Sequence, residues 1–239
     1  MKKLRTEMGW STADKIVVRG KDLPGELLGR INLGDMAWLE LTGRTPSASE
    51  SRMFNAMVVT LVEHGVTPSA IAARMTYLGA PEAMQAAVAA GLCGLGSVFV
   101  GSTEGCARML MENDSVESIL ASYKQIPGLG HPIHKPVDPR TEKLFEIARE
   151  CGFFGSYCEL MISLAKARNL TLNATGAIGA ISCEMKLDWK AVRGLGVMAR
   201  AVGLVGHLLE ESRDPMAAEI WHRIEAEATE HARPKKPSP

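Results

Sequence analysis

The sequence lacks an excess of charge of either sign. Lysine and arginine total 27, aspartate and glutamate also total 27, and the formal net charge is zero. A general attraction to nucleic acid or to an anionic membrane therefore has no electrostatic basis. We expect neither as a partner, and any anionic ligand must be held by a local cluster of basic side chains.

Paired cysteines are also missing. The chain has five cysteines, an odd number, and no CxxC pair. This pattern argues against both a disulfide framework and a structural zinc site. The basic N-terminus has no apolar stretch behind it that could act as a secretory signal. Together these absences predict a cytoplasmic protein with reduced thiols.

One charge-free segment, Ala83 to Thr103, is long enough to span a bilayer. It contains four glycines, has Glu82 and Glu104 at its ends, and lacks the aromatic belt and basic flank of a membrane helix. We therefore expect a buried helix followed by a loop.

Helix signals dominate the rest of the chain, which is 46% hydrophobic and 23% charged and so has the apolar side chains for a sizeable core. Capping residues, first-turn prolines and apolar periodicity predict the helix boundaries. Only Lys15 to Arg19 reads as a strand, and the tail from His231 to Pro239 is expected to be disordered. The expected helices are a capping-box helix from Ser47 to Gly65, then 68–79, one from Pro81, 115–123, 139–150 and 189–209.

A conspicuous loop runs from Gln125 to Arg140. Its four prolines and two glycines prevent helix while they crowd His131, His134 and Lys135 together with Arg140. A rigid, cationic loop that ends at a helix N-terminus is suited to hold carboxylate or phosphate groups. The HxxH pair is not helical and has no third ligand nearby in sequence, so we expect no metal.

Within this loop, PGLGHPIHKPVDPR resembles the PGxGHxVxxxxDPR segment of the citrate synthase superfamily. Other blocks follow in the superfamily's order, and the similarity extends from about Lys15 to Trp221. These blocks are the VEHG that contains His64, the glycine-rich turn at 96–104, the NATG at 173–176 that is similar to NVDG, and the ARAVG that contains Arg200.

Two features favour the lyase branch of this superfamily. The chain is much shorter than a typical citrate synthase, and Phe99 stands where synthases carry the histidine that stabilises the acetyl-CoA enolate. Citryl-CoA lyases and the lyase module of ATP-citrate lyase are similar in having phenylalanine there. The stretch GLVGHLLEE also resembles the GFIGHYLDQ of that module.

The resemblance implies an all-α, citrate-synthase-like fold in a homodimer or a higher homo-oligomer of dimers. Each subunit would have a large helical domain, made of residues 1–101 and 188–230, and a smaller helical domain, residues 102–187, that closes over the active site. An arginine donated by the partner subunit is usual in such sites, and Arg213 and Arg223 are the candidates here.

The resemblance also assigns roles to individual residues. His131 matches the histidine that bonds the substrate's hydroxyl or keto oxygen, and Arg140 and Arg200 match arginines that clamp carboxylates, a task suited to the planar guanidinium. His64 matches a substrate-contacting histidine. Three of them have a structural alternative: His131 could satisfy loop backbone, Arg140 could form a surface ion pair, and His64 could be favoured by a helix C-terminus.

Residues for the coenzyme A part of the substrate follow from the same loop. Lys135 falls where the family places a basic residue near the CoA phosphates, with Gly130 beside it. A solvated surface lysine is the alternative for Lys135. Phe99 is assigned to the substrate site. No permanently bound cofactor is expected, because the coenzyme A thioester is a substrate.

The chain departs from the family at Thr175, where the family has its catalytic aspartate. A threonine hydroxyl donates or accepts a hydrogen bond but cannot act as a carboxylate base. Synthesis is therefore disfavoured, whereas cleavage depends less on the carboxylate if His131 or a water takes the hydroxyl proton. Glu104 or Glu184 could replace it from another direction.

The function implied is cleavage of citryl-CoA, or of a related 3-hydroxy-3-carboxyacyl-CoA, to oxaloacetate and acetyl-CoA by retro-Claisen chemistry. Two alternatives stay open. One is a citrate or 2-methylcitrate synthase-type acyltransferase. The other is a degenerate subunit that binds an acyl-CoA or a polycarboxylate without turnover.

Overall fold

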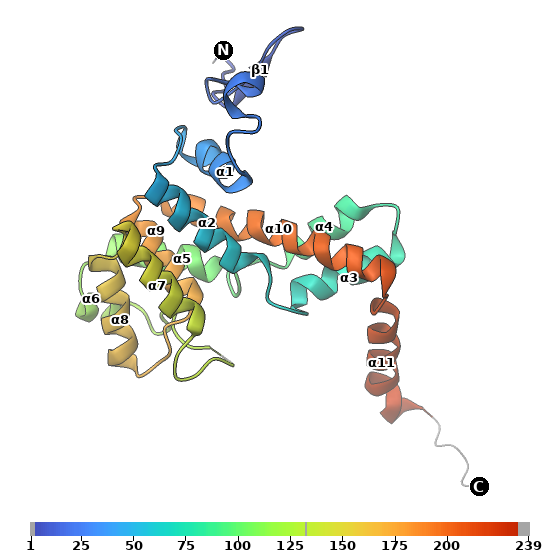
Figure 1. Cartoon of the computed structure of the whole chain (residues 1–239). Helices are drawn as coiled ribbons and strands as arrows, with labels where there is room; N and C mark the ends of the chain where they lie inside the picture. The colour runs from blue at the N-terminus through green and yellow to red at the C-terminus, as the bar shows by residue number, and fades with distance from the viewer. Residues whose placement is uncertain (1–2, 132, 234–239) are drawn as a thin grey trace. The chain divides into compact units, whose positions relative to one another are not determined.

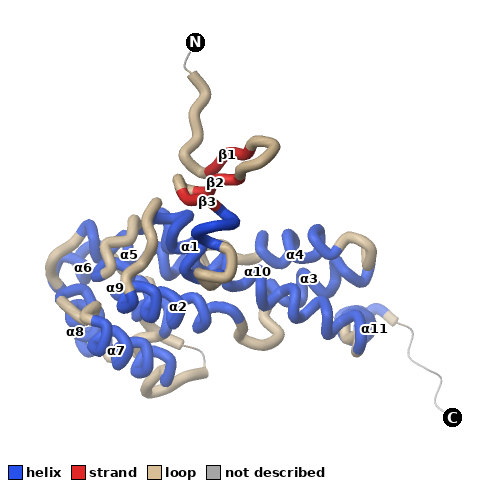
Figure 2. Tube along the Cα trace, turned by 45° about the horizontal axis from the view of Figure 1, so that its top comes forward, coloured by secondary structure: helices blue, strands red, loops and turns tan. Residues whose placement is uncertain are grey.

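The computed structural model of the chain describes residues 3–131 and 133–233. Helices form most of it (Figure 1), and the fold class is all-α, as predicted. The strands in the described part are short and lie near the N-terminus (Figure 2). They are β1 (Gly9–Ser11), β2 (Ile16–Val18) and β3 (Lys21–Asp22), which form an antiparallel sheet in the order β1-β2-β3. A π-helical turn at Leu23–Leu27 follows the sheet. Strand β2 lies inside the strand predicted at Lys15 to Arg19.

The chain forms two compact units, each built from separate stretches of sequence. Unit 1 is Met1–Leu61 with Val100–Gly196, and unit 2 is Val62–Phe99 with Val197–Pro239. The large and small domains expected from the family resemblance, with boundaries after residues 101 and 187, stay a prediction.

Unit 1 is organised around one buried helix, α9. The helices α5, α7 and α8 all contact it, and every residue from 176 to 183 is buried. Close approach requires small side chains: a Cβ on Gly179 would lie 2.8 Å from the Cys106 sulfur. The helices are α1 (Leu33–Thr42), α2 (Ala48–Val62), α5 (Gly101–Glu112), α6 (Val116–Ser122), α7 (Pro139–Cys151), α8 (Ser156–Arg168), α9 (Ala174–Glu184) and the start of α10 (Trp189–Arg213).

Unit 2 packs the rest of α10 against α3 (Pro68–Gly79) and α4 (Met84–Cys93). Its core contains Ala73 and Ala87 with Leu204 and Leu208, all fully buried. Burial of such aliphatic side chains is the main stabilising contribution in a small core. The chain then continues through α11 (Ala217–Thr229) into a single 3₁₀ turn, Glu230–Ala232.

A buried ion pair ties the helices of unit 2 together. Arg74 on α3 is 1% exposed, and its Nη1 donates to Glu211 Oε2 on α10 at 2.7 Å. The other Glu211 oxygen accepts from the backbone N–H groups of Met216 and Ala217, where α11 begins. Glu210 also pairs with Arg74, but it is largely exposed.

Most predicted helix boundaries are confirmed. The capping box is formed, because Ser47 N–H donates to Glu50 Oε2 at 2.8 Å and Glu50 N–H donates to Ser47 Oγ at 3.2 Å. The helices predicted at 68–79, 115–123 and 139–150 correspond to α3, α6 and α7 within a residue or so. The long run from Trp189 continues to Arg213, beyond the predicted end.

Two further predicted boundaries are wrong. The helix expected to reach Gly65 ends at Val62, because the Glu63 carboxylate accepts the His64 and Gly65 N–H groups and turns the backbone away. The helix expected from Pro81 begins at Met84, after a turn in which Ala83 N–H donates to Ala80 O. The charge-free segment is a helix followed by a loop, as predicted, but only Ala87 and Gly91 of α4 are fully buried.

The C-terminal tail is partly described. His231 belongs to the 3₁₀ turn rather than to a disordered segment, and Arg233 Nε donates to Thr229 Oγ1 at 2.7 Å to hold this end against α11. Residues 234–239 lie outside the described residues. By length and composition α10 could cross a membrane, and half of its apolar window is buried inside the protein.

Arg74→Met tests the buried ion pair. The variant leaves the Glu211 carboxylate buried without its cation, which costs about 3–5 kcal/mol of unfolding free energy. Urea unfolding followed by circular dichroism measures the change. The control is Glu210→Gln, which removes the exposed partner and should cost no more than about 1 kcal/mol. Equal losses in the two variants would contradict the assignment.

Candidate functional site

The loop that contains His131 is attached to the segment that leads into α9. Gly130 N–H donates to Thr171 O at 2.7 Å, and Asn173 N–H donates to Gly128 O at 3.0 Å. Between them, Leu129 and Leu172 form an isolated antiparallel bridge. The loop is therefore held by backbone hydrogen bonds on a rigid helix start, which is a suitable support for a site.

Glycine is required at one position of this contact. Gly128 has φ +90°, and a Cβ on it would lie 2.9 Å from the Gly176 backbone nitrogen. Gly130 has φ +85°, but a Cβ there would meet nothing within 4 Å. Both residues use the left-handed backbone that favours glycine, and only Gly128 also makes a close contact.

The Asp138 carboxylate joins the beginnings of two helices. Asp138 is fully buried at the N-cap of α7, where Oδ1 accepts the Arg140 N–H at 3.0 Å. Oδ2 accepts the Ala174 N–H at the first residue of α9, also at 3.0 Å. Burial acts to raise the pKa of Asp138, but the hydrogen bonds from Arg140 and Ala174 outweigh it and lower the pKa below its ordinary value. Asp138 is therefore an anion at neutral pH.

The same carboxylate orients the Arg140 side chain. Arg140 Nε donates to Asp138 Oδ1 at 3.0 Å and Nη2 donates to Oδ2 at 2.8 Å, a two-pronged pair. The Arg140 side chain is 30% exposed, whereas its partner is buried. This is not the ordinary surface ion pair that was the alternative for Arg140, since a fixed guanidinium faces the loop.

The backbone fixes the proton position on His131. Its Nδ1 accepts the N–H groups of Ile133 at 3.1 Å and His134 at 2.9 Å. A neutral imidazole that accepts at Nδ1 carries its proton on Nε2. His131 Nε2 lies 3.3 Å from Arg140 Nη2. Both nitrogens then carry N–H groups, so an oxygen placed to one side of the pair, within hydrogen-bond reach of each nitrogen, would accept from both.

Thr175 lies in the first turn of α9 within a chain of hydroxyl groups. Its Oγ1 donates to Asn173 Oδ1 at 2.6 Å and accepts from Ser102 Oγ on α5 at 3.1 Å. Asn173 is the N-cap of α9, and its Nδ2 donates to Gly130 O at 2.7 Å. The Thr175 hydroxyl is therefore part of the network that fixes the loop, and it supplies no negative charge.

The two glutamates considered as replacements for the family aspartate have other partners. Glu104 pairs with Arg193 at 2.5 Å. Glu184 Oε1 accepts the N–H of Tyr157 at 2.7 Å and of Cys158 at 3.3 Å, at the start of α8. Both carboxylates are thus engaged in structural contacts of unit 1.

Two further loop residues surround His131. Lys135 is exposed. The ring of His134 lies beside that of His131, with 4.4 Å between centroids, although the loop is not helical. The expectation that no metal binds stays a prediction, as do the CoA contacts assigned to Lys135 and Gly130.

The other predicted residues belong to unit 2. His64 lies two residues beyond the end of α2 rather than in its last turn. Phe99 is 48% exposed, which is unusual for phenylalanine in a core. Five predicted residues, His131, Thr175, Arg140, Lys135 and Gly130, thus lie in unit 1 and three in unit 2; their gathering around one ligand stays a prediction.

Arg200 is the third predicted residue of unit 2, and it is 7% exposed on α10. Its Nη1 donates weakly to Thr67 Oγ1 at 3.4 Å, and its Nε has no hydrogen-bond partner in the described part of the chain. Burial lowers the pKa of Arg200, while the Glu63 carboxylate acts in the opposite direction. A buried guanidinium with an unused N–H is suited to hold an anion.

Two residues of unit 2 were not assigned from the sequence. His207 is 8% exposed and lies 3.1 Å from the Glu63 carboxylate. The GLVGHLLEE stretch that contains His207 was noted as a family block, and Glu63 directly precedes His64. The signal was therefore available, but a histidine in an apolar helix has no partner that sequence alone can show.

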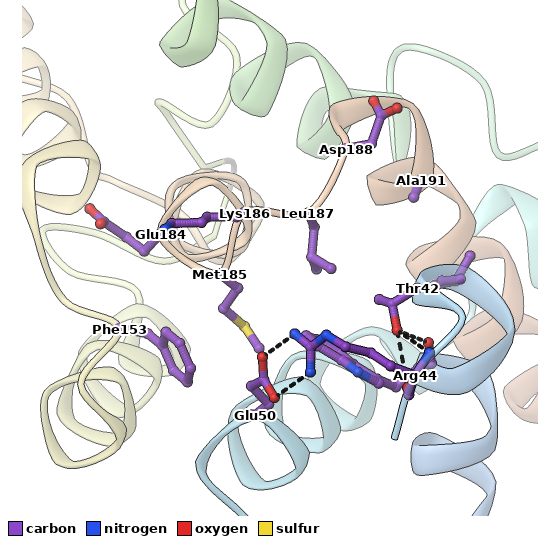
Figure 3. A pocket seen from close by; sticks show the side chains of 12 residues that line it. Thr42, Arg44, Glu50, Phe153, Glu184, Met185, Lys186, Leu187, Asp188 and Ala191 are labelled. Carbon is purple, nitrogen blue, oxygen red and sulfur yellow. Dashed lines mark hydrogen bonds and ion pairs between the residues drawn. The ribbon is translucent and has the colours of Figure 1, made fainter. Parts of the chain in front are cut away.

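Unit 1 also has a hollow of about 560 Å³ whose lining includes Glu184 but none of the residues assigned to the substrate site. Figure 3 shows Arg44 joined to Glu50 there by two hydrogen bonds, at 2.5 and 2.9 Å. The bonds from Arg44 lower the pKa of Glu50 to about 2. These charges are satisfied within the protein, so the hollow contributes no group to the chemistry considered below.

The chain matches known proteins over most of its length. The family described as "Citrate synthase, C-terminal domain" matches residues 32–223. The structure of citryl-CoA lyase from Hydrogenobacter thermophilus is 36% identical and has a TM-score of 0.80, with 88% of this chain and 87% of that one covered.

Larger proteins contain a similar segment. The structure of ATP citrate lyase from Methanothrix soehngenii in complex with citrate and coenzyme A has a TM-score of 0.77 and is 20% identical. The match covers 89% of this chain and 39% of that one. At this identity the likeness shows the fold alone. A probable ATP-citrate synthase of Dictyostelium discoideum is 26% identical over 212 residues, which cover 77% of this chain. This chain spans only 34% of that relative's length.

Asp138→Asn should change how stability depends on pH. Because the folded-state pKa of Asp138 is below its ordinary value, its stabilisation is present above the unfolded pKa and is lost as pH falls below about 4. At pH 7 the unfolding free energy of the variant should be about 1.5–3 kcal/mol lower than that of the wild type. As the pH is lowered further, the unfolding free energy of the variant should fall less steeply than that of the wild type. Urea unfolding of both proteins between pH 7 and pH 3 measures how the unfolding free energy depends on pH. The same dependence in variant and wild type would refute the lowered pKa assigned to Asp138.

Gly128→Ala and Gly130→Ala form a matched pair. Both variants place a Cβ on left-handed backbone, a cost of about 1–2 kcal/mol. Gly128→Ala also pushes a methyl group into the Gly176 backbone, which adds about 1–3 kcal/mol. Thermal unfolding should therefore show a clearly larger loss for Gly128→Ala. Similar losses in both would mean that the loop does not contact α9 as described.

Proposed function

The chain belongs to the citrate synthase family, and we propose that it is a carbon–carbon lyase that cleaves citryl-CoA, or a related 3-hydroxy-3-carboxyacyl-CoA, to oxaloacetate and acetyl-CoA. The observation that carries the proposal is the pair of donors formed by His131 Nε2 and Arg140 Nη2, 3.3 Å apart on fixed supports. The 36% identity with a citryl-CoA lyase over most of both chains supports it.

The reaction breaks the bond between the thioester α-carbon and the hydroxyl-bearing carbon. The hydroxyl loses its proton, its oxygen becomes the keto oxygen of oxaloacetate, and the electron pair of the broken bond forms the acetyl-CoA enolate. A proton then adds to the α-carbon to give acetyl-CoA. Negative charge therefore develops first on the hydroxyl oxygen and then on the thioester oxygen, and fixed donors at these oxygens lower the barrier.

His131 acts as a donor in this proposal, not as the base. Its Nδ1 is occupied by two backbone N–H groups, so the proton on Nε2 points to the substrate oxygen. Arg140 Nη2 donates to the same oxygen or to the adjacent carboxylate while Asp138 holds the guanidinium. With both donors in place, a water molecule can take the hydroxyl proton.

Thr175 cannot exchange a proton with the acetyl-CoA carbon in either direction of the reaction. Condensation requires a base to remove a proton from acetyl-CoA, and the Thr175 hydroxyl, which donates to Asn173, is not a base. In cleavage the enolate forms from the broken bond and needs only a proton. The Thr175 hydroxyl therefore serves in positioning, and water supplies the proton.

The remaining assignments complete the substrate site. Arg200 and His64 would hold substrate carboxylates, Phe99 would line the acyl group, and Lys135 would approach the CoA phosphates near Gly130. The homodimer, the cytoplasmic location and a partner arginine belong to the same proposal. Arg213 and Arg223 are both exposed, and Glu219 lies 3.9 Å from Arg223.

Synthetic citryl-CoA tests the activity directly. The wild type should release oxaloacetate, detected by coupling to malate dehydrogenase and loss of NADH absorbance. His131→Ala removes one donor at the developing charge and should lower kcat about 10²–10³-fold. Lys143→Ala is the control, because Lys143 is an exposed residue of α7 whose partner is Glu146; its rate should not change.

Other outcomes would overturn the proposal in distinct ways. Release of free CoA from acetyl-CoA and oxaloacetate, without citryl-CoA cleavage, would indicate a synthase-type acyltransferase. Binding of citryl-CoA in calorimetry without release of product would indicate a subunit that has lost turnover.

A further inference from the structure

His207 is a buried histidine whose proton position is set by a neighbouring arginine. Its Nδ1 accepts from Arg74, with 3.3 Å to Nε and 2.9 Å to Nη2. An arginine side chain is always a donor, so Nδ1 must be unprotonated when His207 is neutral. The imidazole proton is then on Nε2, at the opposite side of the ring.

The Nε2 proton of His207 points to the Glu63 carboxylate. The distance from Nε2 to Glu63 Oε1 is 3.1 Å. The same oxygen accepts the N–H of His64 at 2.8 Å and the N–H of Gly65 at 2.6 Å. One carboxylate oxygen thus links a buried histidine of α10 to the backbone of the loop that contains His64.

Glu63 also sets the charge near Arg200. It is the acidic group whose field opposes the effect of burial on the Arg200 guanidinium. Burial of Glu63 acts to raise its own pKa, but the hydrogen bonds from His64 and Gly65, together with His207, lower it. Glu63 is therefore ionised at neutral pH and acts on two of the three predicted site residues of unit 2, His64 and Arg200.

We propose that His207 is a positioning residue for substrate binding: it holds the Glu63 carboxylate in place, and Glu63 in turn fixes the His64 loop and lies near Arg200. The proposal rests on the proposed function, in which His64 and Arg200 contact the substrate. His207 itself touches no substrate. Its loss should weaken binding of the substrate without removing a group that acts on the reacting bond.

Three variants separate positioning from simple stabilisation. His207→Ala removes the hydrogen bonds of the imidazole to Arg74 and to Glu63. His207→Gln keeps them in principle, because the glutamine amide offers one oxygen acceptor to Arg74 and one N–H donor to Glu63. Leu208→Ala is the control: Leu208 is the next residue on α10 and is fully buried in the core of unit 2, so its loss destabilises without touching Glu63.

Steady-state kinetics with citryl-CoA give the first readout. For His207→Ala we expect KM to rise about tenfold while kcat stays within about threefold, the pattern for loss of binding that is equal in ground and transition states. His207→Gln should restore KM to within about threefold of wild type. Leu208→Ala should lower the melting temperature and leave KM unchanged.

Hydrogen–deuterium exchange gives a second readout that needs no activity. The amides of His64 and Gly65 should exchange at least about tenfold faster in His207→Ala than in wild type, and not in Leu208→Ala. If wild type cleaves no citryl-CoA, the proposed function fails, and exchange alone decides whether His207 holds the loop. Unchanged exchange and KM in His207→Ala, or equal changes in Leu208→Ala, would overturn the proposal.

Discussion

The arrangement of unit 1 depends on one buried carboxylate. Asp138 accepts N–H groups from the first turns of α7 and α9, and it also holds the Arg140 guanidinium. A buried anion is stable only when it is paired and hydrogen-bonded, and here the positive ends of two helices and an arginine meet that requirement together. The same contacts that keep Asp138 charged therefore define where Arg140 points.

Donor groups characterise the candidate site of this unit, and Thr175 stands where the family resemblance predicts a carboxylate. His131 is committed to donation through Nε2 by two backbone contacts, and Thr175 is committed to Asn173. A set of fixed donors can stabilise charge as it forms, but it cannot start a reaction by taking a proton from carbon. Proton transfer to or from carbon at this position would therefore need a water molecule.

Much of the architecture could be predicted from local sequence signals. Capping residues placed the starts of α2, α3 and α7, since an N-cap hydrogen bond is made within a few residues of its own helix. The end of α2 was missed because the Glu63 carboxylate satisfies the following N–H groups, a contact that competes with the helix and has no distinct sequence signature. The packing of small residues around α9 could not be predicted from the sequence either, because it depends on partners distant in sequence.

The candidate site shows the same division. Family motifs identified His131, Arg140 and Arg200, and the loop composition alone indicated a rigid cationic segment. The role of Asp138 as the support of Arg140 needed the structure, since in the sequence Asp138 is only the residue before the helix predicted at 139–150. The structure was also needed to show that His131 donates through Nε2, because the tautomer depends on which backbone N–H groups reach the ring.

The interior of α9 has a consequence for how this protein can diverge. With its residues from 176 to 183 enclosed by three other helices, and with glycine at points of closest approach, enlargement of a side chain has no free direction in which to relax. The exposed segment around Lys135 has no such restriction. Natural variation should therefore accumulate in this exposed segment, whereas α9 should stay nearly invariant among homologues.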